Sequence, residues 1–136
     1  MSAVLLDTCT VLWLANGDPL HKAALDAIRA AQADEAILVS PITAWEIGTK
    51  VAKGGLALND EPEAWFERFL ALPGIRLAEL SPWVLTASTR LPGAPPRDPA
   101  DRIILATAMA LDVPVVTRDG RILPYAAAGY ARALPC

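Results

Sequence analysis

Short uninterrupted apolar runs alternate along the chain with longer stretches in which apolar residues recur at helical spacing. Residues 3–6, 36–39 and 115–117 are apolar runs of strand length, which is typical of parallel strands buried on both faces. Residues 75–78 alternate between apolar and polar, and this pattern predicts an edge strand with one face in water. A last strand is expected around residues 130–133.

Helices are expected between these strands, and several begin with a recognisable capping signal. At residues 40–41, 81–82 and 98–99 a Ser or Asp precedes a proline, and this pair suits an N-cap followed by the first helical position. Alternating strands and helices predict an α/β fold with a mainly parallel sheet. The expected helices cover residues 10–15, 19–33, 40–53, a part of 59–72 capped by Asp60, 82–90, 98–112 and 123–128.

The length of 136 residues is that of one domain, which we expect to cover residues 1–136. Hydrophobic residues make up 54% of the chain, which is enough for a sizeable core. No apolar stretch approaches the roughly 18 residues that a membrane span needs, and the first residues lack the basic leader of a secretory signal. Two separated cysteines, Cys9 and Cys136, do not suggest a disulfide framework. Together these features favour a cytoplasmic protein without membrane association.

The charge and the histidine content exclude several kinds of function. A formal net charge of −3 argues against nucleic-acid binding through a broad positive surface. The chain has one histidine, His21, which we expect at the surface near a helix start. A zinc site built from nitrogen and sulfur ligands is therefore close to excluded, as are most nucleophiles that depend on a neighbouring histidine.

Four acidic residues border the expected strands. Asp7 follows the first strand directly, Glu46 lies two turns into the helix after the second, and Asp101 and Asp119 flank the last helix–strand unit. Ligands of α/β sheets gather where strands end and helices begin, so these carboxylates are expected at one edge of the sheet. Two like charges about 4 Å apart repel by roughly 1–4 kcal/mol. A cation such as Mg²⁺ or Mn²⁺ relieves that repulsion and can activate water for phosphodiester hydrolysis.

Most of these acids also have a purely structural interpretation. Asp7 suits the cap of the helix that follows it, and Asp98 is better explained as a cap than as a metal ligand. Asp101, in the first turn of its helix, is a favourable partner for the helix dipole. Asp119 precedes a glycine, which is typical of a turn. It is the joint placement of the acids, more than any single residue, that predicts a site.

Glu46 and Lys50 are four residues apart in the favourable order, which is also typical of a solvated helix face. On this interpretation the charged face would lie opposite an apolar face made by Ile42, Trp45 and Val51. Taken alone, Glu46 is better explained in this way than as a ligand.

Basic and aromatic residues near the same edge have two interpretations each. The basic residues either hold substrate phosphates or serve as solubilising counter-charges. The tryptophans are better explained as core or subunit-contact residues than as platforms for nucleotide bases. The basic residues are Lys50, Lys53, Arg97, Arg102, Arg118 and Arg121, and the tryptophans are Trp13, Trp45, Trp65 and Trp83.

Four segments that contain these acids are similar in kind, order and spacing to the motifs of a known family. They are LLDT (5–8), VSPITAWEIGTKVAKGGL (39–56), RDPADRIILATA (97–108) and VVTRDG (115–120). Together they span nearly the whole chain, and their joint match is specific although none is specific alone. In these segments the chain resembles the PIN-domain ribonucleases, in particular the VapC-type toxins of bacterial type II toxin–antitoxin pairs.

The resemblance implies a PIN-like three-layer α/β/α fold with the first strand central, and an endoribonuclease that depends on Mg²⁺ or Mn²⁺. Asp98 resembles an additional acid of this subgroup, and its contact with metal is left open. Thr8 and Thr117 resemble hydroxyls that steady neighbouring carboxylates, although a helix-start hydrogen bond and β-propensity explain them as well. By resemblance, four acids take the metal-site positions: Asp7, Glu46, Asp101 and Asp119.

The resemblance also carries expectations about partners. It implies an RNA substrate, a homodimer whose acidic pockets face a shared groove, and an antitoxin of the VapB type that is a separate chain. A guanidinium of the antitoxin could pair bidentately with the carboxylates that would otherwise hold metal.

Other functions fit the residues less well. A housekeeping RNA-processing nuclease without an antitoxin is the alternative within the same class. An aspartyl-phosphate protein fits poorly, because receiver domains need paired acids where Asp7 stands alone, and the related phosphatases need an aspartate where Cys9 stands. A non-catalytic binding module leaves the acids unexplained.

Overall fold

Five parallel strands form one sheet in the computed structural model, which describes residues 2–136. The strands lie in the order β3-β2-β1-β4-β5, so the first strand is central, as expected. In register, Leu5 lies between Leu38 and Val115. The strands are β1 (Val4–Leu6), β2 (Ile37–Val39), β3 (Ile75–Leu77), β4 (Val115–Thr117) and β5 (Ala133–Pro135).

The helices begin and end at local signals in the sequence. Ser40 and Ser81 cap α3 and α5 by accepting hydrogen bonds from the N–H groups of Ile42 and Val84. The helix α6 ends at Asp112, which adopts a left-handed conformation with φ of 52°. The helices are α1 (Thr8–Asn16), α2 (Lys22–Ala33), α3 (Pro41–Ala52), α4 (Pro62–Leu70), α5 (Pro82–Ser88), α6 (Pro99–Leu111) and α7 (Ile122–Ala127).

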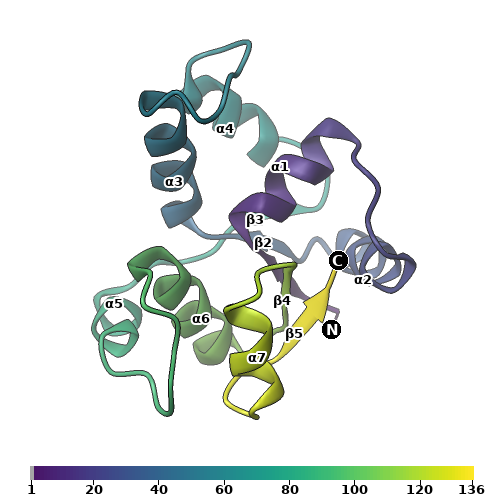
Figure 1. The fold of residues 1–136 in the computed structure, drawn as a ribbon. Helices are drawn as coiled ribbons and strands as arrows, with labels where there is room; N and C mark the ends of the chain where they lie inside the picture. The colour runs from purple at the N-terminus through teal and green to yellow at the C-terminus, as the bar shows by residue number, and fades with distance from the viewer. Residues whose placement is uncertain (1) are drawn as a thin grey trace.

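Successive residues of each central strand pack into different cores, because side chains alternate across a strand. Val4 and Leu6 pack with apolar residues of α1, α2 and α4, whereas Leu5 packs with Ile104 and Ala108 of α6. Figure 1 shows this division, with α1, α3 and α4 grouped above the strands and α5, α6 and α7 grouped below them. The result is a three-layer arrangement, and the ends of β1 and β4 lie next to each other in it.

Two predicted details of the elements are wrong. The last strand covers residues 133–135, because residues 129–130 belong to a turn in which Gly129 has φ of 98° and Tyr130 stacks on Tyr125. The cap of α4 is Glu61, because the Asp60 carboxylate pairs instead with Arg68.

The orientation of α3 differs from the solvated-face interpretation of Glu46. Thr43 and Ile47 are buried, Glu46 is half-buried, and Trp45 is 62% exposed. Its hydrophobicity predicted that Trp45 would lie on the inner face of the helix. In the structure Trp45 points outward, and Glu46 lies toward the rest of the molecule. His21 is exposed just before α2, as expected.

None of the helices in residues 2–136 has the length and apolar character needed to cross a membrane.

Candidate active site

Asp7 lies at the end of β1 and is held by hydrogen bonds from two directions. Its Oδ1 accepts the N–H of Thr8 at 2.8 Å, and its Oδ2 accepts the hydroxyl of Thr117 at 2.7 Å. Asp7 is therefore the cap of α1, as its structural interpretation expected, and is also tied to the end of β4. The side chain is buried, so both oxygens are fixed by protein donors in a poorly solvated place.

Glu46 reaches the same region from α3. Its Oε1 accepts the hydroxyl of Thr8 at 2.5 Å, and that hydroxyl also lies 3.1 Å from the hydroxyl of Thr43. Thr8 thus touches two acids, with its N–H on Asp7 and its O–H on Glu46. The hydrogen bond with Thr8 explains why Glu46 is half-buried.

Asp119 follows β4 and folds a turn around its own carboxylate. The Oδ1 atom accepts the N–H groups of Arg121 at 2.7 Å and Ile122 at 3.3 Å. The N–H of Asp119 donates to the Thr117 hydroxyl at 2.9 Å, and this same hydroxyl donates to Asp7. Thr117 therefore fixes Asp7 and Asp119 relative to each other.

Asp101 belongs to the first turn of α6, and its side chain is buried. The capping of α6 by Asp98 Oδ1, which accepts the Asp101 N–H at 3.0 Å, fixes this turn. Among the described residues, Asp101 Oδ2 is a buried side-chain oxygen without a hydrogen-bond partner. The Nη2 atom of Arg121 lies 3.6 Å from this oxygen and 3.5 Å from Asp119 Oδ2.

Shared contacts join the four predicted acids into one connected network. The network runs from Glu46 through Thr8 to Asp7, through Thr117 to Asp119, and through Arg121 to Asp101. The described part of the chain contains no group of three or more His, Cys, Asp or Glu side chains that stands in a metal-coordinating arrangement. The donor set nevertheless suits a hard divalent cation, because it consists of carboxylates and includes one buried oxygen without a donor.

The carboxylates titrate differently because their surroundings differ. Burial, followed by repulsion from Asp119, raises the pKa of Asp101 to about 7. Burial also raises the pKa of Asp7 and of Glu46, although hydrogen bonds from Thr117 and Thr8 oppose the change. Burial acts in the same direction on Asp119, but the N–H and guanidinium of Arg121 outweigh it and hold the pKa of Asp119 below its usual value. This separation of values is what close carboxylates produce when one is better neutralised than the others.

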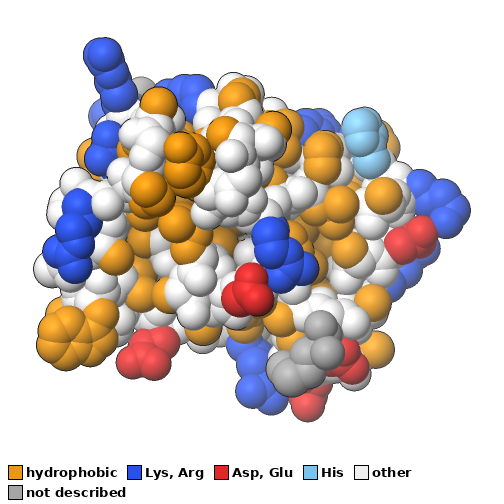
Figure 2. Space-filling view, turned by 90° about the horizontal axis from the view of Figure 1, so that it is seen from below, with side chains coloured by type: hydrophobic (Ala, Val, Ile, Leu, Met, Phe, Trp, Pro, Cys, Tyr) orange, Lys and Arg blue, Asp and Glu red, His pale blue; other side chains and the backbone are white. Residues whose placement is uncertain are grey.

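The predicted basic residues lie at several different places. Lys50 Nζ is 3.9 Å from the sulfur of Cys9, whereas Arg102 Nε donates to the Pro96 carbonyl at 2.6 Å. Arg97 is exposed and lines a cleft between α5 and α6 together with Arg102. On the face shown in Figure 2, the Lys and Arg side chains are separated by apolar and neutral atoms. On that face the basic side chains do not gather into one positive surface.

Arg118 is committed to contacts that tie the fold together. Its guanidinium lies 4.0 Å from the centre of the Trp13 ring and donates to the carbonyl oxygens of Cys136 and Pro19, each at 2.8 Å. These contacts link the end of β4 to α1 and β5.

Comparison with known proteins assigns the family. The sequence pattern of the PIN-domain family matches residues 4–128 of the chain. The chain belongs to the PIN-domain family. Ribonuclease VapC22 of Mycobacterium tuberculosis is 32% identical to this PIN domain over 123 residues, which cover 90% of this chain and 91% of that protein. The resemblance found in the sequence segments is thereby confirmed.

Solved structures confirm the PIN-like fold. A chain in the structure of VapBC2 from Rickettsia felis bound to a promoter DNA fragment has a TM-score of 0.69 at 14% identity, with 98% of both chains covered. A chain in the structure of FitAB bound to an IR36 DNA fragment has a TM-score of 0.59 at 22% identity, with coverage of 97% of this chain and 94% of that one. At these identities the likeness concerns the fold.

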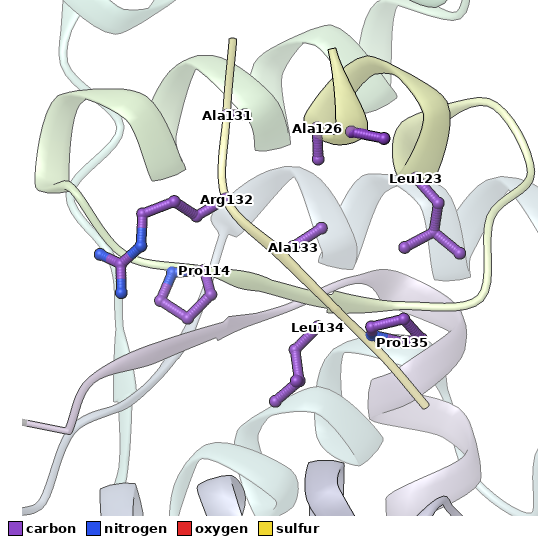
Figure 3. Close-up of a pocket in the computed structure, with 9 residues that line it drawn as sticks. Pro114, Leu123, Ala126, Ala131, Arg132, Ala133, Leu134 and Pro135 are labelled. Carbon is purple, nitrogen blue, oxygen red and sulfur yellow. The ribbon is translucent and has the colours of Figure 1, made fainter. Parts of the chain in front are cut away.

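A cleft of about 690 Å³ lies beside β5 (Figure 3), and none of the acids of the network lines it. Its lining has one charged side chain, Arg132, and is otherwise made of alanine, leucine and proline. Such a lining lacks the acids and bases that phosphodiester chemistry needs, so the acidic network is the better candidate for the active site of this PIN domain.

Two contacts of the network were missed in the sequence. Thr43 was not singled out, although it lies three residues before Glu46 and therefore on the same side of α3. Arg121 was counted among basic residues of the edge, without its pairing to Asp101 and Asp119. Its position two residues after Asp119, at the start of α7, is the signal that could have found it.

Thr117→Val is expected to lower the free energy of unfolding by about 1–3 kcal/mol, because it leaves the buried Asp7 with one donor fewer. Urea unfolding measures this change. Thr86→Val is the matched control, since the Thr86 hydroxyl bonds a helix carbonyl at an exposed position. Equal effects of the two substitutions would contradict a special role for Thr117.

Proposed function

We propose that this PIN domain is a Mg²⁺- or Mn²⁺-dependent endoribonuclease that acts as the toxin of a type II toxin–antitoxin pair. The observation that carries the proposal is the connected network of acids from four separate elements, with its buried, donor-free Asp101 oxygen. The 32% sequence identity to Ribonuclease VapC22, over 90% of this chain, supports the same activity.

The residues of the network would divide the chemistry among them. Asp7, Glu46, Asp101 and Asp119 would hold the cation directly or through water. When bound, a divalent cation supplies the Lewis acidity that makes water a nucleophile toward phosphorus. Thr8 and Thr117 fix the carboxylates before substrate arrives, which removes the cost of ordering them during the reaction. Glu46 and Asp98 are the candidates for orienting the attacking water.

Substrate phosphates would be held by basic side chains around this site. Lys50 of α3, beside Cys9, is one candidate, because its charge opposes the rise in the pKa of Asp7 and of Glu46. Arg97 and Arg102 are the other candidates, and Arg118 would first have to give up its hydrogen bonds to Cys136 and Pro19. Local contacts of this kind suit a chain whose net charge is negative.

Incubation of the purified protein with total RNA tests the proposed reaction. Cleavage is expected with Mg²⁺ or Mn²⁺ and is expected to stop in excess EDTA, because the proposed reaction depends on the Lewis acidity that the cation supplies. Restoration by added Mn²⁺ is the control for damage by the chelator. Cleavage that EDTA leaves unchanged would contradict the metal-dependent mechanism.

An antitoxin of the VapB type is the proposed protein partner. The structural neighbours are complexes named VapBC2 and FitAB, which motivates a search for a second small chain. Expression of this protein alone is expected to arrest growth, and co-expression of the antitoxin to relieve the arrest. RNA cleavage without growth arrest would instead favour a processing nuclease that has no antitoxin.

A homodimer is the proposed assembly, and exposed apolar side chains support it. Trp45 and Leu77 line one cleft, and Trp83 and Leu111 line another. Trp83 is 80% exposed, which is unusual for so large an apolar side chain in the absence of a partner.

Trp83→Ser is expected to weaken the dimer by at least about thirtyfold, the effect of losing one interfacial residue that contributes roughly 2 kcal/mol. Sedimentation equilibrium measures the dissociation constant. A wild-type protein that is monomeric at micromolar concentration would contradict the dimer, and the ribonuclease assignment would stand without it.

A further inference from the structure

One nitrogen atom of the protein already lies where two acids of the network meet. Nη2 of Arg121 is 3.6 Å from Asp101 Oδ2 and 3.5 Å from Asp119 Oδ2. These two carboxylates come from different elements, the first turn of α6 and the segment after β4. A positive group that contacts both is in the position of a bridging cation.

The backbone and the side chain of Arg121 have different degrees of freedom. The backbone is anchored, because its N–H donates to Asp119 Oδ1 at 2.7 Å. The side chain is 64% exposed, so the guanidinium can swing into water without disturbing the core. Asp101, in contrast, is 5% exposed and cannot turn to solvent for neutralisation.

Three other basic residues of this edge contact groups outside the ion pairs of Asp101 and Asp119. Lys50 lies near Cys9, Arg102 donates to Pro96, and Arg118 donates to Cys136. Within residues 2–136, Arg121 is thus the basic side chain whose ion pairs join two acids of the network.

We propose that Arg121 is an exchangeable counter-ion of the acidic site: its guanidinium pairs with Asp101 and Asp119 in the protein without metal, and a divalent cation has to displace it to bind there. This inference rests on the proposed function, because it assumes that the acids bind a cation. It assigns Arg121 a role that opposes metal binding, whereas the acids favour it. A guanidinium about 3.5 Å from the two carboxylates would occupy the space that an arriving cation needs and would also repel it.

Calorimetric titration with Mn²⁺ alone tests the role of Arg121. Arg121→Gln is expected to bind Mn²⁺ about two- to fivefold more tightly than the wild type, the range that a partly exposed ion pair supports. Arg132→Gln is the matched control, because Arg132 is 60% exposed and pairs with Asp112 rather than with the network. Its affinity for Mn²⁺ is expected to equal that of the wild type. Asp119→Asn, which removes a ligand, is expected to weaken binding and so locates the Mn²⁺ at this site.

A second variant, together with a check of folding, distinguishes an effect of the Arg121 charge from an effect of altered structure. Arg121→Lys retains the charge but not the planar fork, so its affinity for Mn²⁺ is expected between those of the wild type and Arg121→Gln. Far-UV circular dichroism checks that each variant is folded. In EDTA, Arg121→Gln is also expected to unfold at a lower temperature than Arg132→Gln, because the buried acids have lost their counter-ion.

The outcomes separate this inference from the proposed function. Equal or weaker Mn²⁺ binding by Arg121→Gln, or tighter binding by Arg121→Lys than by Arg121→Gln, would overturn the role of Arg121 and leave metal-dependent RNA cleavage intact. An absence of Mn²⁺ binding in the wild type and in Arg121→Gln alike would overturn both.

Discussion

Asp119→Asn is expected to reduce RNA cleavage by at least about a hundredfold while leaving the protein folded. Loss of even an outer-shell partner of a metal typically costs 10- to 100-fold in activity or affinity, so loss of a ligand should cost at least that much. The asparagine retains an acceptor oxygen for the N–H groups of Arg121 and Ile122, so the turn after β4 is preserved. The charge that would attract a cation is lost.

Asp7→Asn is expected to have the same effect on cleavage, because Asp7 lies at the other side of Thr117 in the same network. Asp112→Asn is the matched control. Asp112 has an 88% exposed side chain and a left-handed backbone that asparagine tolerates. Initial rates on total RNA in Mn²⁺ measure the effect. Full cleavage by both Asp7→Asn and Asp119→Asn would refute the assignment of the site.

Asp101→Asn is expected to stabilise the metal-free protein by about 2–4 kcal/mol above pH 7, and by little near pH 4. Burial raises the pKa of Asp101 from 3.8 to about 7 in the folded protein. At pH values between 3.8 and about 7, the Asp101 carboxyl holds a proton in the folded state that it has released in the unfolded state, so the free energy of unfolding falls progressively as the pH rises. Asparagine removes that loss because it carries no charge at any pH.

Urea unfolding in EDTA at several pH values between 4 and 8 measures this dependence. The wild type is expected to lose stability over that range, since the pKa values of Asp7 and Glu46 are also raised, and Asp101→Asn is expected to show a smaller slope. Asp112→Asn is again the control and should keep the slope of the wild type. An Asp101→Asn variant with an unchanged slope would indicate that Asp101 is ionised at little cost in the fold.

Local signals in the sequence were enough to predict most of the sheet and its helices. Strand β4 coincides with the predicted run at 115–117, and the Ser40 and Ser81 caps follow from a serine before a proline. The central place of β1 was implied by the resemblance and is seen in the strand order. The strands and caps depend on short stretches of chain and can be read locally, whereas the central place of β1 came with the family resemblance.

Features that depend on contacts between distant segments could not be read in the same way. Trp45 was placed on an inner face by its hydrophobicity, but the orientation of α3 is set by Thr43 and Glu46 meeting Thr8. Asp60 had the sequence of a cap, but its carboxylate pairs with Arg68 in the last turn of the same helix, a choice that the cap signal alone does not reveal. The candidate acids were selected because they lie at the strand ends in the sequence. The threonine and arginine contacts that connect them became apparent only in the three-dimensional structure.

The hydrogen bond between Thr117 and Asp7 spans 110 residues of sequence and has a consequence during synthesis. The partner of Asp7 leaves the ribosome only after the chain from Asp7 to Thr117 has been made. A nascent chain that has released its first strand therefore lacks the far half of the acidic constellation, and a truncated translation product would lack it permanently. For a protein that we propose to attack RNA, this arrangement delays the hazardous chemistry until Thr117 has emerged and paired with Asp7.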